Sequence, residues 1–111
     1  MLTIHKGLRA PTILRFVQED YPVQMNVINR VQIYFKEGVC LDTYNLEHEG
    51  IINLIENNTA ILVFFGLYEK LEIGDYNFYT TVYTPSDSEG IPWGGRPKRL
   101  RIRSWPVCQS S

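Results

Sequence analysis

The sequence is poor in the residue types that usually carry catalysis or bind metals. Among its 111 residues are two cysteines and two histidines. Cys40 and Cys108 do not form a Cys-x-x-Cys pair, so a metal or redox site is not indicated. We expect both to be free thiols, with a disulfide between them as the alternative. No serine, cysteine or lysine has the sequence context of an activated nucleophile. We therefore expect no catalytic residues, no metal site and no cofactor, and a protein that is not an enzyme.

Long apolar runs are also missing. The longest run of strictly apolar residues, 60–65, is far too short to cross a membrane, so no membrane partner is expected. Residues 1–6 lack the basic region and apolar core of a signal peptide, which favours a cytoplasmic location. Residues 57–59 match a glycosylation acceptor triplet, but without a secretory signal we interpret them as a turn. Glu47-His48-Glu49 is a weak alternative metal site, because two carboxylates flanking one histidine are not specific for a metal.

Acidic residues are absent after position 90. Residues 1–90 carry twelve acidic and six basic side chains, a net charge of −6, whereas residues 91–111 carry five basic and no acidic side chains, a net charge of +5. Such asymmetry indicates either an interaction tail or a last strand that pairs with acidic neighbours. The overall isoelectric point near 6.1 argues against nucleic acid as a partner.

Short stretches rich in β-branched and aromatic residues dominate the rest of the chain. Val31, Ile33 and Phe35 share one face of an alternating segment, which is typical of a half-buried strand. Seven or eight such strands predict one all-β domain over residues 1–111, a sandwich or barrel. Strands are expected at 12–17, 26–36, 39–44, 51–55, 60–65, 77–84 and 98–104, the last one basic, with a short strand or arm at 2–5.

Two connections are less regular. Residues 66–70 are either one helical turn or a loop that crosses between two sheets. Residues 85–97 contain three glycines and three prolines, which predicts a long loop before the last strand. The expected core comprises Ile13, Phe16, Val31, Ile33, Phe35, Ile52, Leu62, Phe64, Leu71, Tyr76, Phe78, Val82, Leu100 and Ile102.

One short motif has a structural mechanism. Leu71, Gly74 and Tyr76 come directly before a predicted strand, in the order found at the tyrosine corner of immunoglobulin-like sandwiches. There the leucine plugs the core, the glycine permits the bend, and the tyrosine hydroxyl bonds to nearby backbone. An ordinary turn that happens to hold these residues is the alternative. The corner favours an immunoglobulin-like antiparallel β-sandwich of seven to eight strands.

With this corner in place, residues 2–84 resemble the small immunoglobulin-like domains of tailed-phage virion proteins. The chain is most similar to the amino-terminal domain of the baseplate upper protein family and related prophage modules. It departs from the family pattern at two places. The family often has Asp where this chain has Leu8, and often has Leu-Thr-Gly where this chain has residues 25–27. The segments that carry the resemblance are 6–7, 13–16, 22–25, 31–35, 50–52, 71–76 and 78–83.

The resemblance implies a structural subunit of a tail, neck or baseplate, located in the virion or, before assembly, in the host bacterial cytoplasm. Its partners would be other virion proteins or further copies of itself in a homo-oligomer. A candidate interface combines an aromatic anchor with basic side chains: Trp93, Arg96, Lys98, Arg99, Arg101 and Arg103. The alternative function is a small carbohydrate-binding module, in which Trp93, Tyr79 and Tyr83 form an aromatic platform.

Overall fold

The computed structural model describes residues 2–16, 28–35, 38–56 and 58–104. Within these ranges the chain is mostly β-strand, with two short 3-10 turns, η3 (Leu46–His48) and η4 (Phe65–Leu67), and no α-helix. No helix there is long and apolar enough to cross a membrane. The predicted all-β class is therefore confirmed.

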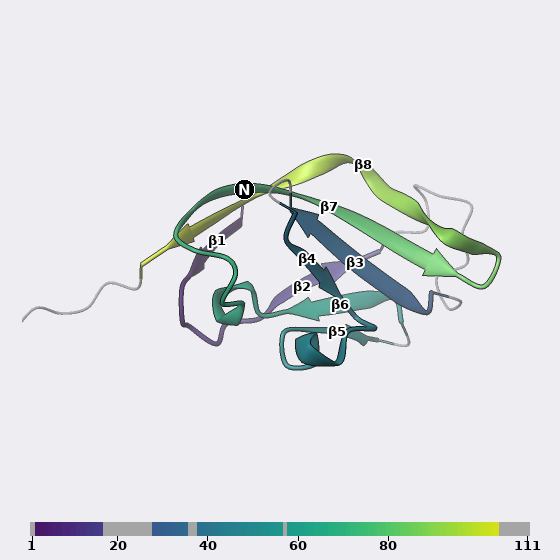
Figure 1. The fold of residues 1–111 in the computed structure, drawn as a ribbon, viewed down its shortest axis with the longest axis horizontal. Helices are drawn as coiled ribbons and strands as arrows, with labels where there is room; N and C mark the ends of the chain where they lie inside the picture. The colour runs from purple at the N-terminus through teal and green to yellow at the C-terminus, as the bar shows by residue number, and fades with distance from the viewer. Residues whose placement is uncertain (1, 17–27, 36–37, 57, 105–111) are drawn as a thin grey trace, which may run out of the picture.

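The strands form two sheets (Figure 1). The larger sheet has the order β1-β8-β7-β3-β4, and the smaller has the order β2-β6-β5. β1 runs parallel to β8, and every other pairing is antiparallel. The bounds are β1 (Leu2–His5), β2 (Thr12–Arg15), β3 (Arg30–Phe35), β4 (Cys40–Asp42), β5 (Ile52–Ile55), β6 (Ala60–Val63), β7 (Gly74–Thr84) and β8 (Asp87–Arg103).

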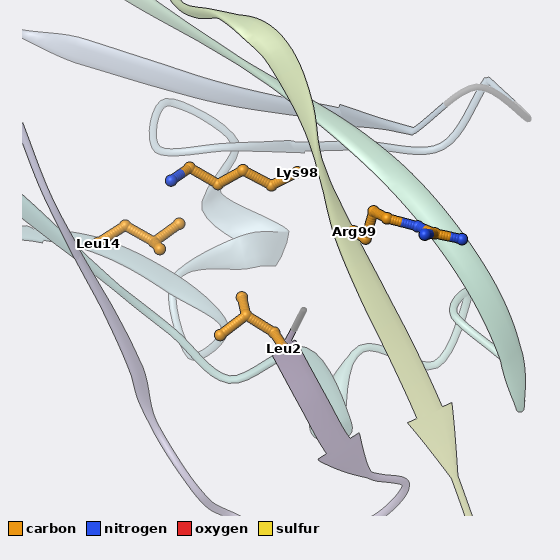
Figure 2. Close-up of a pocket in the computed structure, with 4 residues that line it drawn as sticks. All are labelled: Leu2, Leu14, Lys98 and Arg99. Carbon is orange, nitrogen blue, oxygen red and sulfur yellow. The ribbon is translucent and has the colours of Figure 1, made fainter.

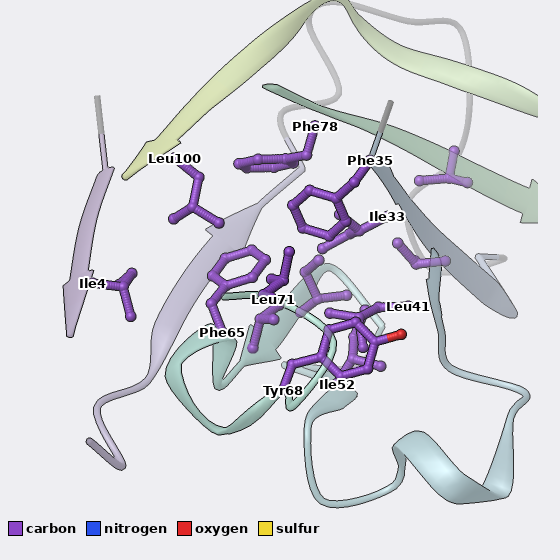
Figure 3. Close-up of a cluster of buried hydrophobic side chains, with 14 of the residues drawn as sticks. Ile4, Ile33, Phe35, Leu41, Ile52, Phe65, Tyr68, Leu71, Phe78 and Leu100 are labelled. Atoms are coloured by element: carbon purple, nitrogen blue, oxygen red, sulfur yellow. The ribbon is translucent and has the colours of Figure 1, made fainter. Parts of the chain in front are cut away.

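One hydrophobic core joins the two sheets into a sandwich-like fold (Figure 3). Phe65, which follows β6, packs edge-on against Phe35 of β3, with ring centroids 6.2 Å apart, and lies 5.4 Å from Phe78 of β7. All three rings are fully buried. Ten of the residues predicted for the core are buried: Phe16, Val31, Ile33, Phe35, Ile52, Leu71, Phe78, Val82, Leu100 and Ile102.

The core prediction is wrong at Ile13, Leu62 and Phe64. Ile13 is 42% exposed, because it lies on the outer face of the edge strand β2. In residues 60–65 the prediction chose the wrong phase, that is, the wrong set of alternating side chains for the core. Ile61 and Phe65 are buried, whereas Leu62 and Phe64 are half-buried. A continuous apolar run has no alternation, so its sequence does not reveal which side chains face inward. Tyr76 is half-buried and packs against the edge of the core.

The long loop predicted at 85–97 is also wrong. β7 and β8 form a hairpin in which Thr84 pairs with Asp87, and the strand continues through the predicted loop into the basic strand. β1 covers only residues 100–103 of β8. The earlier part of β8 pairs with β7 on one side only and is a sheet edge on the other, where proline and glycine are tolerated because no strand there needs an N–H group.

The crossing from the small sheet to the large sheet contains the predicted corner. The segment after β6 begins with the turn η4 and then crosses to the larger sheet, so both alternatives for residues 66–70 are observed in part. Leu71 is fully buried, and the Tyr76 hydroxyl donates a 2.9 Å hydrogen bond to the carbonyl of Glu72. Lys6 clamps the same segment, since its Nζ donates to the carbonyls of Tyr68 (2.8 Å) and Leu71 (2.5 Å). Gly74, within the corner, is the first residue of β7.

Candidate docking surfaces

The outer face of the larger sheet exposes tyrosines. Tyr34 of β3 is 45% exposed and Tyr79 of β7 is 43% exposed, and the two pair in register with ring centroids 6.5 Å apart. Strand alternation places them here because Ile33 and Phe78, their neighbours in sequence, face the core. Exposed tyrosines on a rigid sheet are typical of protein interfaces.

Next to this tyrosine pair, Arg30 forms a network of contacts on the same face of the larger sheet. The Arg30 guanidinium lies over the rings of Tyr44 and Tyr83, 5.0 and 4.9 Å from their centroids. It also donates to both carboxylate oxygens of Asp42. Gln32 donates to Asp42 at 2.8 Å and accepts a 2.5 Å hydrogen bond from the Tyr83 hydroxyl. These contacts hold the rings of Tyr44 and Tyr83 in place.

The Asp42 carboxylate is charged well below neutral pH. Burial is the largest single influence and opposes ionisation, but hydrogen bonds from three groups and one charge outweigh it. The hydrogen bonds come from Arg30, the Tyr44 N–H and Gln32, and the charge is that of Arg30. Together they lower the pKa of Asp42 to about 2.

The predicted basic residues lie on β8 but do not form one cluster. Arg101 pairs with Asp75 of β7 at 2.8 Å, so the interpretation that the last strand pairs with acidic neighbours holds at this position. The hydrogen bond from Arg101 lowers the pKa of Asp75. Arg99 and Arg103 alternate with the buried Leu100 and Ile102, on the same outer face as Arg101. Arg96 and Lys98 are exposed as well.

Trp93 lies on the opposite face of the β7–β8 pair from Tyr79 and Tyr83. It pairs with the buried Thr80, and its ring packs edge-on against Phe16 at 5.2 Å. Tyr79 and Tyr83 alternate with Thr80 and point to the other face. The structure does not bring Trp93 together with these tyrosines, so the predicted aromatic platform is wrong in its composition.

A pocket opens where β2 faces β1 and β8 (Figure 2). It has a volume of ≈ 320 Å³ and is lined by Leu2, Leu14, Lys98 and Arg99. In Figure 2 the two leucines point toward each other, Lys98 extends over them, and the Arg99 side chain points away from them. A second pocket of ≈ 250 Å³, lined partly by Trp93, shares Leu14 and Lys98 with the first.

The leucines of this pocket were not predicted as site residues. Leu2 and Leu14 come from different sheets, and only the folded chain brings them together. The sequence signal was limited to the basic residues Lys98 and Arg99.

The histidines and cysteines of the described ranges lie outside these surfaces or form local contacts only. No group of three or more histidine, cysteine or acidic side chains there could hold a metal ion. Nδ1 of His48 accepts a 3.1 Å hydrogen bond from the Asp42 N–H, and its ring packs edge-on against Tyr68. Cys40 is a free thiol whose pKa is raised by burial, and Cys108 lies outside the described residues.

No protein-family model matches the chain, and a search of curated proteins finds no match.

Proposed function

We propose that the chain is a non-enzymatic structural or assembly protein of a phage or prophage virion, in the tail, neck or baseplate. It works by docking against other virion proteins or further copies of itself. The proposal rests on the resemblance of residues 2–84 to virion immunoglobulin-like domains. The observation that supports it best is the strand order around the tyrosine corner.

The strand order is compatible with an immunoglobulin-like sandwich, and this supports the proposal. β2, β6 and β5 take the places of strands B, E and D, and β3, β7 and β8 those of C, F and G, with β4 beside β3 as in variable-type domains. Tyr76 lies near the start of β7, the strand-F position, and its hydroxyl bonds four residues upstream. The chain departs from this pattern in β1, which pairs with β8 and not with β2.

The outer sheet face supports a docking role. Tyr34 and Tyr79 are large, rigid and about half exposed, and Arg30 is held between two further tyrosines. Tyrosine and arginine are the residue types that most often anchor protein interfaces. Because the Arg30 network is already ordered, little side-chain entropy is lost when a partner covers it.

The test is the protein content of particles. Mass spectrometry of tail particles purified from the phage or induced prophage that encodes this chain should recover its peptides in a fixed ratio to a known tail protein. Tyr79→Ala combined with Tyr34→Ala should reduce incorporation, whereas Ile73→Ala, an exposed residue outside this sheet face, serves as a matched control. Particles that lack the chain altogether would contradict the proposed function.

Carbohydrate binding is a second candidate, supported by one feature. A pocket of ≈ 190 Å³ is lined by Arg30, Tyr44 and Tyr83 together with polar groups from the β7–β8 turn. Tyr44 is 58% exposed and could stack on a sugar ring. A glycan array probed with the purified chain should then give signals that Tyr44→Ala removes and that Trp93→Ala leaves. An array without signals would exclude this candidate.

A further inference from the structure

The pocket between Leu2, Leu14 and Lys98 combines an apolar floor with an unpaired charge. Leu2 and Leu14 are half-buried and face the opening (Figure 2). Within the described parts of the chain, no hydrogen bond or ion pair engages the Lys98 ammonium, unlike Lys6, which bonds two carbonyls. A fitting ligand therefore offers an apolar side chain next to a carboxylate.

The same chain carries such a group on the turn that follows β4. Leu46 is 84% exposed, so its apolar side chain is available for contact, and Glu47 follows it directly. Among the described residues, nothing pairs with the carboxylates of Glu47 and Glu49. We call residues 44–49 the acidic knob.

The acidic knob is held rigidly in its exposed position. The Asn45 side chain accepts a 2.9 Å hydrogen bond from the Glu47 N–H, and the Glu49 N–H donates to the Leu46 carbonyl. His48 ties the turn to β4 through its bond with the Asp42 N–H. Because the turn is ordered already, docking Leu46 costs little conformational entropy.

We infer that the acidic knob of one copy docks into the Leu2–Leu14–Lys98 pocket of a second copy, with Leu46 on the two leucines and Glu47 beside Lys98. This inference rests on the proposed docking function and names its partner. The pocket lies on β1 and β8, at one edge of the larger sheet, while the knob follows β4, at the opposite edge. One copy can therefore use both sites at once, which makes the contact head-to-tail and builds a ring or a filament.

Sedimentation of the purified full chain over a range of concentrations tests the inference. The wild type should associate reversibly into species larger than a dimer. Leu46→Ala should weaken association roughly tenfold to a hundredfold, because the variant no longer buries a leucine side chain when two copies associate. Lys98→Glu and Glu47→Lys should each weaken it too, because each places like charges face to face. Added salt should weaken the wild-type contact.

The decisive measurement is an equimolar mixture of Lys98→Glu and Glu47→Lys. Each variant alone presents a repulsive contact, but in the mixture every knob finds a pocket of opposite charge in the other variant, so association should return. Glu69→Lys and Lys70→Glu reverse exposed charges outside both sites and serve as matched controls. Circular dichroism verifies that each variant is folded.

The outcomes separate this inference from the proposed function. A monomeric wild type, or association that survives Leu46→Ala and both charge reversals, would overturn the knob-in-pocket contact. If that wild type were still recovered in virions, the proposed function would stand without it. If the mixture regains association but virions lack the chain, the contact would stand and the virion role would fail.

Discussion

Gly66 occupies a place where two backbones meet. A Cβ atom there would lie 2.5 Å from the His5 carbonyl oxygen and 2.8 Å from that of Leu8, closer than real Cβ contacts come. The Gly7 N–H donates a 2.7 Å hydrogen bond to the Gly66 carbonyl, so the two segments are held at this distance. Glycine is therefore required by a contact between segments about 60 residues apart.

Gly66→Ala should destabilise the fold by about 1–3 kcal/mol, the usual cost of forcing extra atoms into a packed site. Gly50→Ala is the matched control, since a Cβ at Gly50 meets nothing within 4 Å. Urea denaturation of both variants measures the difference. Equal midpoints for the two would show that the crossover moves freely away from the N-terminal segment.

Asp42 makes the fold sensitive to acid. Its pKa is lowered from 3.8 to about 2 in the folded chain. A carboxylate with a depressed pKa contributes stability above its unfolded pKa, and this contribution is lost as the pH falls through the folded value. The contribution is about 2 kcal/mol, and it should disappear between about pH 4 and about pH 2.

Asp42→Asn should lower stability at neutral pH and flatten the stability profile over this acidic range. Denaturation midpoints measured across the range give the slope. Asp75→Asn removes a carboxylate whose side chain is 61% exposed and should change the slope much less. A variant at Asp42 that keeps the wild-type slope would show that the acid sensitivity has another origin.

At the scale of elements, strand phase decides which aromatic side chain supports the core. Phe65 is fully buried between Phe35 and Phe78, whereas Phe64 is half-buried beneath the Arg9 guanidinium, 4.9 Å from its ring centroid. The two residues are neighbours in sequence and identical in type, so their different roles come only from the direction in which the strand end turns.

Phe65→Ala should cost about 3–5 kcal/mol, the range for deleting a buried aromatic ring. Phe64→Ala should cost clearly less, because its ring retains contact with water in the native state. Thermal unfolding of the two variants compares them directly. The larger shift for Phe64→Ala would mean that the phase of residues 60–65 is the one predicted from sequence.

At the scale of the whole molecule, the two sheets depend on one core. Ile33 from the larger sheet and Ile61 from the smaller belong to the same buried cluster, and both are fully buried. Few hydrogen bonds between main chains connect the sheets, so their side chains provide most of the contact. Without the other sheet, the inner face of each sheet would be exposed to water.

The sheets should therefore unfold in a single cooperative transition. Ile33→Val and Ile61→Val, each costing about 0.5–1.5 kcal/mol, should lower the same midpoint. Far-ultraviolet and near-ultraviolet circular dichroism follow the backbone and the aromatic side chains. Two separate transitions, each moved by one variant only, would contradict a shared core.

The sequence by itself determined the all-β class, most of the core, and the Leu71–Tyr76 corner. These features depend on local pattern: alternation in β3 and β7 places every second side chain inward, and the corner tyrosine bonds only four residues away. Four basic residues of the predicted interface, Lys98, Arg99, Arg101 and Arg103, were also expected on the last strand and lie on β8, whereas Arg96 was expected in a loop and lies on the same strand.

Tertiary structure alone decided the rest. The phase of residues 60–65 depends on which side the second sheet covers, and β8 extends through a glycine- and proline-rich stretch because β7 is there to pair with it. The pocket lies between β2 of the smaller sheet and the β1–β8 pair of the larger sheet, so it exists only because β1 pairs with β8. Such contacts join residues far apart along the chain, and local patterns of hydrophobicity and charge do not specify which distant segments will meet.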